Sequence, residues 1–272
     1  MKQSQFYYLL RRGLFNAGSA IIKNGLVMFN KFTTAGISHP AQGSAEFNGS
    51  SDYIQTGDAI NEELGSVSFW VYSDTAINNS TPYIMPIDFQ AGVSEHAVTL
   101  GSWTGAFTNE VISLGATIPS PWRIGWLTAD SNAIPAGWNH IAISQTSGTY
   151  SIYLNGSSVP VTTDGTPVAF DVKTLNIGVR EDAAQFYGFL DGNLANVAIW
   201  NRALSSDEIN SVMWKSYEAL TSAESNGLQA WYSLDDITSP AASLANMEQL
   251  ATDKNATIEN KAAITAAINA LS

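Results

Sequence analysis

Apolar and polar side chains alternate most regularly between Trp138 and Gly178. Residues 141–143 and 150–154 place apolar side chains at every second position, and residues 175–179 repeat this pattern. A period of two gives a segment one apolar and one polar face, which is typical of a half-buried antiparallel strand. The three runs therefore predict three strands.

Two turn signals lie between these runs. Gly148 separates the first run from the second, and Asn155-Gly156 follows the second. The Asn-Gly dipeptide tolerates the positive φ angles that a tight hairpin turn needs. We therefore expect the three runs to form a β-meander, around which the rest of the domain is arranged.

Other parts of the chain carry weaker strand signals. Residues 66–73 present bulky side chains on both faces, which favours a central strand in a two-layer structure. Pro82 and Pro86 favour an edge position for residues 81–89, because proline cannot donate a hydrogen bond to a neighbouring strand. Residues 101–128 are rich in tryptophan and largely lack a period, so we expect an irregular stretch. Shorter strand candidates lie around Phe47 and at residues 53–54, 96–101, 110–115, 197–200 and 230–234.

One helix is clearly indicated before the C-terminal tail. Ser205 and Glu208 form the S-x-x-E pattern of a capping box. Apolar residues recur behind it at helical spacing, at Ile209, Val212, Met213 and Tyr217. A second, alanine-rich helix is predicted in the C-terminal tail, with a narrow apolar stripe at Ile264, Ile268 and Leu271. So narrow a stripe indicates a helix that packs on another surface.

The N-terminal segment has a different character. Residues 1–43 combine aromatic side chains with glycines and hold five of the twelve basic residues of the chain. We expect an arm that buries its aromatic side chains against its own domain or a neighbouring chain. Its local positive charge suits an acidic partner or a second copy, and a solvated basic face is the alternative. Arg11 and Arg12 cut the apolar stretch short, so we also expect a protein made without a cleaved signal peptide.

The composition excludes several classes of protein. Hydrophobic residues make up 45% of the 272 residues, enough for a large core, whereas charged residues make up only 13%. The formal net charge of −12 repels phosphate backbones, so we expect no nucleic-acid partner. The absence of cysteine excludes disulfides and thiolate metal sites. No apolar run approaches the roughly 20 residues of a membrane-spanning helix, so we expect no membrane insertion.

Six motifs occur in order along the chain, namely FNGSSDYI, SFWV, WNHIAI, YSIYLNG, LNIG and FYGFLDGNLANVAIWNRALSSDEI. Together they strongly resemble the laminin G-like jelly-roll domains of the concanavalin A-like lectin/glucanase superfamily, which is also related to the pentraxins. The resemblance covers residues 44–217. It implies an all-β fold, a two-sheet antiparallel jelly-roll sandwich with a short helix after the last core strand. The alternating pattern independently favours the same two-layer class.

The chain accordingly divides into three parts. We expect an N-terminal arm at residues 1–43, the jelly-roll domain at residues 44–220 and a C-terminal segment with a returning strand and a helical tail at residues 221–272. The motif GLQAWYSLDD at residues 227–236 resembles a segment that often opens such domains, yet here it follows the helix. It either completes an edge of the sandwich or begins a truncated second repeat, and we favour the first.

The sequence offers no catalytic pair, so we expect a protein that is not an enzyme. Glucanases with this fold place paired carboxylates on one strand with the spacing E-x-D-x-E or one residue more, and neither spacing occurs. His39, His96 and His140 lie far apart in the sequence. We interpret His140 as a packed, hydrogen-bonded side chain within a strand.

The resemblance also implies a calcium site. Domains of this type often hold calcium at the rim of a sheet, with oxygen ligands from two distant loops. The matching positions are Asn48 and Asp52 in the FNGSSDY turn and Asp191 in GFLDGNL. Asp and Asn serve equally well as turn formers, which is the alternative.

A sugar site needs an aromatic face and a few amide or carboxylate partners. The stretch at residues 101–128 supplies five large side chains, Trp103, Phe107, Trp122, Arg123 and Trp126. They form our candidate glycan site, and the alternative is core of an edge strand or an oligomer contact. We assign Trp70, Trp138 and Trp200 to the core or its margin.

These observations favour a structural protein of a virus particle, such as a bacteriophage, that displays a lectin-like domain as a head decoration, a fibre or a tail adhesin. Its expected partners are other virion proteins or copies of itself, through residues 1–43 and 240–272, and a cell-surface glycan. The expected location is the virion surface. A bacterial surface or secreted carbohydrate-binding adhesin is the alternative, and a glycan-active enzyme a remote one. We expect binding in loops and arms, with the meander as scaffold.

Overall fold

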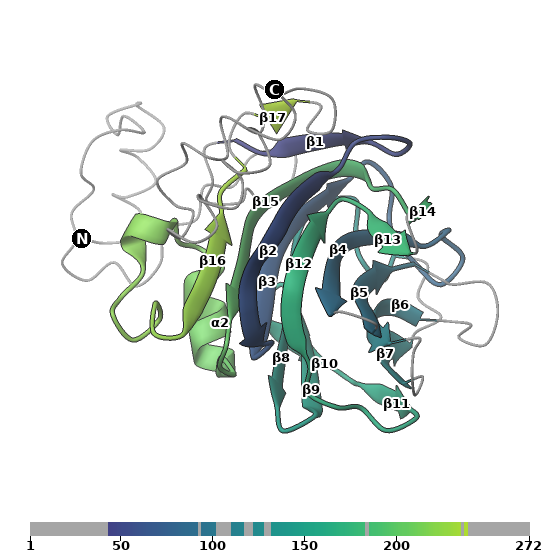
Figure 1. Ribbon diagram of the computed structural model, residues 1–272. Coiled ribbons are helices and arrows are strands. Elements are labelled where there is room, and N and C mark those ends of the chain that lie inside the picture. Colours follow the sequence, from purple (N-terminus) through teal and green to yellow (C-terminus); the bar gives the residue numbers. More distant parts are fainter. Residues whose placement is uncertain are drawn as a thin grey trace, which may run out of the picture.

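The computed structural model describes residues 43–91, 94–101, 110–116, 122–127, 132–182, 185–234 and 237–238. These residues form two large sheets packed face to face, with a short α-helix outside one of them (Figure 1). The strand pairs are antiparallel apart from one short parallel pair, β1 with β17. The predicted two-sheet antiparallel sandwich is confirmed. Both the N-terminal arm and the alanine-rich C-terminal helix lie outside the described residues.

The first sheet has eight strands in the order β10-β9-β8-β3-β15-β1-β17, with β16 also paired to β15. Its strands are β1 (Ala45–Asn48), β3 (Ser66–Ser73), β8 (Gly137–Thr146), β9 (Thr149–Leu154), β10 (Ser157–Val159), β15 (Asp191–Trp200), β16 (Leu228–Tyr232) and β17 (Ile237–Thr238). One side of β15 pairs with β3, and the other side is shared between β1 and β16. The motif GLQAWYSLDD therefore contributes a strand to the sandwich, as we favoured.

The second sheet has seven strands in the order β11-β7-β6-β5-β4-β12-β2. Its strands are β2 (Ile54–Glu63), β4 (Ile84–Ala91), β5 (Ser94–Leu100), β6 (Glu110–Ala116), β7 (Trp122–Leu127), β11 (Thr162–Asp164) and β12 (Asp171–Ile177). A separate two-stranded hairpin consists of β13 (Arg180–Asp182) and β14 (Gln185–Tyr187).

The main core lies between the two large sheets. Val67, Phe69 and Val71 of β3 face Ile87 and Phe89 of β4 across one buried cluster, and each is at most 1% exposed. Full burial of such a side chain contributes about 1.5–3 kcal/mol. Because successive strand residues point to opposite faces, the residues between them lie on the outer faces of the sheets.

The meander exists, although its third strand differs from the prediction. Ser147-Gly148 joins β8 to β9, and Asn155-Gly156 joins β9 to β10, with φ of 50° and 79° in each turn. Positive φ at both central residues is the geometry that suits tight hairpins. The alternating run at residues 175–179 was wrongly placed third, because β12 pairs with β2 and β4 in the other sheet. Leu175 and Ile177 contribute to the same core from the opposite side.

The prediction of an edge strand at residues 81–89 is wrong. β4 lies inside the seven-stranded sheet, between β5 and β12. Its pairing with β5 shifts register between Ile84 and Ile87, so Pro86 lies at a bulge where no donor is required. The Pro86 carbonyl still accepts a hydrogen bond from Gly178 N at 2.8 Å.

The irregular stretch expected at residues 101–128 is wrong for residues 122–127, whereas the strand candidate at residues 110–115 is confirmed. Residues 110–116 form β6 and residues 122–127 form β7, two paired strands of the seven-stranded sheet. The aliphatic side chains of Ile112, Leu114 and Ile124 are buried in the main core. Trp122 and Trp126 therefore belong to a strand and not to an irregular loop.

Helix α2 (Ser206–Val212) begins as predicted and ends earlier. Ser205 Oγ accepts a hydrogen bond from Glu208 N, and the Glu208 carboxylate accepts one from Ser205 N, so the capping box is confirmed. The helix ends at Val212, and Tyr217 opens the separate 3-10 turn η1 (Tyr217–Ala219). Tyr217 was expected on the buried stripe but is 38% exposed.

Candidate functional site

Helix α2 lies against the outer face of the eight-stranded sheet, where a second apolar layer forms. Trp200 of β15 is buried there with Ile209 and Val212 of the helix. Trp70 Nε1 donates a hydrogen bond to Met213 O at 2.9 Å, just beyond the helix. Trp70 and Trp200 are thus buried as expected, although in this outer layer and not between the sheets.

The interpretation of His140 as a packed residue is confirmed. Its Nε2 lies 2.7 Å from Ser68 Oγ, and its ring packs edge-on against Trp70 with centroids 5.3 Å apart. The side chain is fully buried, and this burial lowers the pKa of His140 to about 3. His140 is therefore a neutral structural residue beneath the region of α2.

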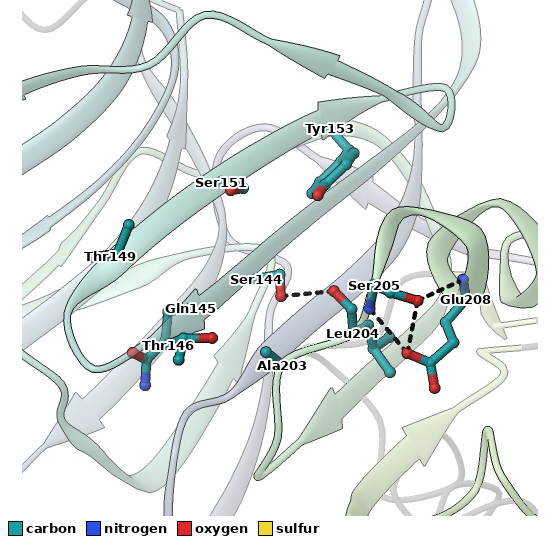
Figure 2. A pocket seen from close by; sticks show the side chains of 10 residues that line it. All are labelled: Ser144, Gln145, Thr146, Thr149, Ser151, Tyr153, Ala203, Leu204, Ser205 and Glu208. Carbon is teal, nitrogen blue, oxygen red and sulfur yellow. Dashed lines mark hydrogen bonds between the residues drawn. The ribbon is translucent and has the colours of Figure 1, made fainter.

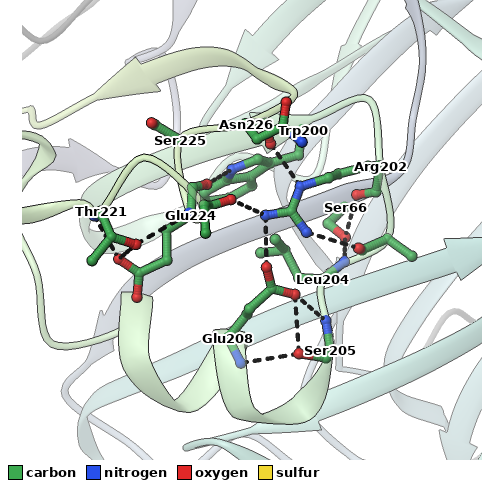
Figure 3. A network of polar contacts seen from close by, with 12 residues as sticks. Ser66, Trp200, Arg202, Leu204, Ser205, Glu208, Thr221, Glu224, Ser225 and Asn226 are labelled. Carbon is green, nitrogen blue, oxygen red and sulfur yellow. Dashed lines mark hydrogen bonds and ion pairs between the residues drawn. The ribbon is translucent and has the colours of Figure 1, made fainter.

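The motif N-R-A-L-S-x-x-E-I fixes the chain between β15 and α2 to the sheet (Figure 3). Ser66 Oγ donates to Arg202 O at 3.0 Å and accepts from Leu204 N at 2.9 Å. Gly65 permits this approach, because a Cβ at that position would lie 2.2 Å from Arg202 N. The segment at residues 202–204 therefore rests directly on the backbone of β3 and its preceding turn.

The Arg202 side chain ties this segment to two further parts of the chain. Its Nη2 lies 2.7 Å from Glu208 Oε1 of α2 and donates to Ala223 O at 2.8 Å. Its Nε donates to Asn226 O at 2.6 Å. The hydrogen bond from Arg202 helps to hold the pKa of Glu208 below its ordinary value. Glu208 thus remains a paired carboxylate.

Glu224 anchors the end of the same region. Its carboxylate accepts hydrogen bonds from Lys215 Nζ, Ser211 Oγ and both the backbone and the hydroxyl of Thr221. Burial raises the pKa of Glu224, but these donors outweigh burial and bring the pKa down to about 2. The chain that leaves α2 is therefore held closely to the loop that leads into β16.

An open groove lies between the β8–β9 hairpin and the start of α2 (Figure 2). We call it the hydroxyl groove, and its volume is about 420 Å³. It is lined by Ser144, Gln145, Thr146, Thr149, Ser151, Tyr153, Ala203, Leu204, Ser205 and Glu208. Ser144 Oγ donates to Leu204 O at 2.9 Å and so joins the hairpin to the opposite wall.

The alternating sequence of the meander produces the hairpin wall of this groove. Thr146 lies opposite Thr149, and Ser144 lies opposite Ser151, so their side chains share the outer face. Tyr153 is the next outward residue on β9 and adds an aromatic ring. None of the four hydroxyls of Thr146, Thr149, Ser151 and Tyr153 forms a hydrogen bond within the described residues. They remain available to a ligand.

The groove carries no unbalanced charge on its lining. Glu208 is the only ionisable carboxylate among the lining residues, and its Oε1 is paired with Arg202. Its Oε2 accepts from both the backbone and the hydroxyl of Ser205, at 2.9 and 3.0 Å. The groove can therefore offer hydroxyl groups and one ring face to an uncharged polar ligand.

The structure places the two described side chains of the predicted aromatic glycan site, Arg123 and Trp126, on opposite faces of β7. Arg123 is buried on the outer face of β7, with its Nη1 2.9 Å from Glu110 Oε2. Burial raises the pKa of Glu110, while the Arg123 guanidinium opposes that shift. Trp126 is partly buried and packs against the main core. Trp103, Phe107 and the side chain of Trp122 lie outside the described residues, so this site stays a prediction.

The predicted calcium ligands come together at one end of β1. Asn48 pairs with Asp191 across β1 and β15, and Asp52 lies in the adjoining turn. Asn48 Oδ1 accepts hydrogen bonds from the backbone N–H groups of Ser50, Ser51 and Asp52 at 2.9–3.2 Å. This oxygen is thus engaged as a turn former, a poor fit to a cation ligand. The described residues contain no group of three His, Asp or Glu side chains placed to hold a metal. The calcium site stays a prediction.

Several exposed residues were missing from the sequence interpretation. Hydroxyl side chains on the polar face of a strand are ordinary, so the sequence alone does not single out Thr146, Thr149 and Ser151. Trp214, directly after α2, is 38% exposed and lies 5.3 Å from the buried ring of Trp70. The only sign of this exposed ring in the sequence is the position of Trp214 just after a short capped helix.

The comparisons with known proteins agree with the architecture. The family model of the concanavalin A-like lectin/glucanases superfamily matches residues 48–210, more than half of the chain. The chain therefore belongs to this superfamily, and its sandwich is the jelly roll that the motifs implied. None of the curated proteins compared with the chain matches it.

Several solved structures resemble this chain weakly. A heptameric SAP-like pentraxin from Limulus polyphemus is 14% identical, with a TM-score of 0.41 over 64% of this chain and 82% of its own. The CBM40 domain of the Ruminococcus gnavus IT-sialidase is 13% identical, with a TM-score of 0.46 over 64% and 98%. Domains LG4-5 of the mouse laminin alpha1 chain are 12% identical, with a TM-score of 0.43 over 61% and 44%. Likenesses this weak carry no functional argument.

Proposed function

We propose that this protein is a carbohydrate-binding protein without catalytic activity, and that the hydroxyl groove holds the saccharide. The observation that carries this proposal is the row of free hydroxyls at Thr146, Thr149, Ser151 and Tyr153 along an open groove of about 420 Å³. Small-molecule sites combine a concave surface with a few well-placed polar groups. Membership of a superfamily that includes lectins supports the same class of ligand.

The chemistry of the lining favours a neutral sugar. Hydroxyls both donate and accept hydrogen bonds, which matches the mixed donors and acceptors of a sugar ring. The Tyr153 ring offers an aromatic face to the apolar side of that ring. An anionic sugar would meet the Glu208 carboxylate with no free cation among the lining residues. We therefore expect neutral hexoses or pentoses to bind in preference to sialylated or sulfated glycans.

A glycan array followed by titration calorimetry tests this proposal. Tyr153→Ala and Ser151→Val should each weaken binding of the best neutral glycan at least about tenfold, equal to about 1.4 kcal/mol. Tyr153→Phe should retain most of the affinity if stacking is the main contribution. Ser158→Ala, an exposed serine of β10, is the matched control. Binding that survives Tyr153→Ala and Ser151→Val, but is lost in Trp126→Ala, would assign the site to β7 instead.

The second part of the proposal is that the lectin-like domain is displayed on the surface of a virus particle. Support comes from the sequence: the absence of cysteine, the low share of charged residues and the basic aromatic segment at residues 1–43. We propose that residues 1–43 and 240–272 make the contacts with other virion proteins or further copies. The alternative is a bacterial surface or secreted adhesin. Within the described part of the chain, no helix is long and apolar enough to span a membrane.

Mass spectrometry of purified particles and of host cell fractions separates these two settings. The virion proposal predicts the chain in particles that have been purified on a density gradient. Deletion of residues 1–43 should remove it from them while glycan binding persists. Recovery only from bacterial surface or culture fractions would favour the adhesin.

A further inference from the structure

A second surface of the eight-stranded sheet has a chemistry opposite to that of the hydroxyl groove. Glu46, Asn193, Tyr72 and Trp138 lie side by side on β1, β15, β3 and β8, in one row across the outer face. Strands in a sheet lie about 4.8 Å apart, so the row spans about 14 Å. We call this row, together with Asp74 and Trp214, the acidic aromatic patch.

The aromatic part of the patch is partly open. The rings of Tyr72 and Trp138 lie 5.5 Å apart, and both side chains are only half-buried. Trp138 also packs against the cluster of Trp70 and Met213, and Trp214 adjoins Trp70 at 5.3 Å. Partly exposed aromatic rings that cluster on a sheet face make this surface a candidate for a contact.

The acidic part has no basic counterpart among the described residues. Asp74 is exposed and accepts a hydrogen bond from Tyr72 Oη at 2.9 Å. Glu46 is exposed at the other end of the row, and neither carboxylate forms an ion pair within the described ranges. Carboxylates beside the faces of Trp and Tyr form a favourable environment for a cationic side chain.

The charge of the chain is divided in a way that complements this patch. Residues 1–45 contain five Lys or Arg residues and no Asp or Glu, which gives a formal charge of +5. The remaining residues contain seven basic and 24 acidic residues, which gives −17. The same N-terminal segment contains six Phe or Tyr residues, which need a surface against which to be buried.

The described chain starts at the patch itself. Gly43 and Ser44 lead into β1, and Asn193 Nδ2 donates a hydrogen bond to Ser44 Oγ at 3.2 Å. An extended chain spans about 3.3 Å per residue, so the thirteen residues between Lys31 and β1 can cover far more than the length of the row.

We propose that, in the free chain and before any assembly contact forms, the basic N-terminal segment, residues 1–42, docks on the acidic aromatic patch of its own chain. Lysine and arginine side chains of the segment interact with Asp74, Glu46 and the rings of Tyr72, Trp138 and Trp214. The site is independent of the sugar proposal, because the patch and the groove share no residue. Opposite charge and a direct connection at Ser44 specify this occupant.

Zero-length carbodiimide cross-linking of the full-length chain, read by mass spectrometry, tests the proposal. We expect links from Lys23 or Lys31 to Asp74 at least about fivefold more often than to Asp207 or Glu62, two exposed acidic residues outside the patch. In an equal mixture of ¹⁴N- and ¹⁵N-labelled protein, these links should join peptides of the same label. Links that join different labels, equal yields at all acidic residues, or no links at all would each overturn the proposal.

Substitutions separate docking from simple charge attraction. Trp214→Ala should reduce the yield of links to Asp74 at least about threefold, because the aromatic contact is lost while the carboxylate remains. Val168→Ala, which alters an exposed apolar residue elsewhere, is the matched control and should leave the yield unchanged. Equal yields in both variants would contradict an aromatic docking surface. A glycan that blocks the links in proportion to its affinity would instead identify the patch as a sugar site.

Discussion

The hydroxyl groove and the acidic aromatic patch lie on the same face of the same sheet, and their chemistry differs. The groove presents free hydroxyls, one tyrosine and a carboxylate already neutralised by Arg202. The patch presents half-buried aromatic rings and two carboxylates without a described basic partner. Strand β8 contributes to both, through Ser144 at one end and Trp138 at the other.

The difference shows how one alternating strand can supply two unrelated surfaces. Outward residues of β8 run from Trp138 through His140 and Ala142 to Ser144, and the layer around α2 buries the middle two. The helix region therefore lies between a half whose carboxylate is paired with Arg202 and an acidic half whose two carboxylates have no described basic partner. An uncharged polar ligand suits the first half and a cationic segment suits the second.

The largest effect is expected from a substitution beneath the segment at residues 202–204, which forms one wall of the groove. Gly65→Ala would force a Cβ within 2.2–2.4 Å of the Arg202 backbone, and no flexible side chain can yield there. We expect a loss of about 3 kcal/mol in the free energy of unfolding, measured by urea denaturation. Any folded Gly65→Ala protein should lose sugar affinity but retain the cross-links at Asp74. Ser158→Ala is the control, and a cost below about 0.5 kcal/mol for Gly65→Ala would show that the segment at 202–204 can move.

His140 lies between the two halves, and uptake of its proton on unfolding should destabilise the fold that carries both. The folded pKa of about 3 lies below the unfolded value of 6.5, so only the unfolded chain binds this proton above pH 3. Its contribution to stability is complete above pH 6.5 and is lost as the pH falls. Between pH 7 and pH 5 we expect a loss of about 2 kcal/mol, which His140→Gln should lack. Equal pH profiles for the two proteins would remove His140 as the cause.

The two-sheet fold class could be predicted, because the alternation of apolar and polar residues directly reflects burial. The pairing of each strand with its neighbours could not be predicted. The runs at residues 150–154 and 175–179 look alike in the sequence and lie in opposite sheets. A period of two indicates which side chains of a strand face the core. It does not indicate to which of the two sheets the strand belongs. Pro86 was misplaced for a similar reason, since a bulge inside a sheet tolerates proline as well as an edge does.

The candidate surfaces were harder to predict than the fold. The hydroxyls of Thr149 and Ser151 gain their meaning only because the segment at residues 203–208 lies opposite them, about fifty residues later in the chain. Arg123 looked like a binding residue beside two tryptophans, yet it pairs with Glu110 of the neighbouring strand. Local composition cannot reveal a partner that long-range pairing brings into contact.

A smaller effect should follow from Glu224, which anchors the chain beyond α2. Its folded pKa of about 2 lies below the ordinary 4.5, so its stabilising effect is present above pH 4.5 and is lost as the pH falls towards 2. Glu224→Gln should cost about 1 kcal/mol at pH 7 and flatten the acid limb of the stability profile. Glu218→Gln, in the nearby 3-10 turn, is the control. If the stability of Glu224→Gln falls with acid as steeply as that of the unchanged protein, another residue anchors the chain beyond α2.

The smallest effect is expected from calcium at the turn that follows β1, beside Glu46 of the patch. Asn48 Oδ1 already accepts three backbone N–H groups, so a cation there would have to displace a turn. We expect a dissociation constant above about 1 mM, which at 1 mM calcium stabilises the fold by at most about 0.4 kcal/mol. Thermal melting with EDTA and with calcium measures this directly. A larger stabilisation that Asp191→Asn abolishes would establish the calcium site and would add a positive charge to the acidic half of the face.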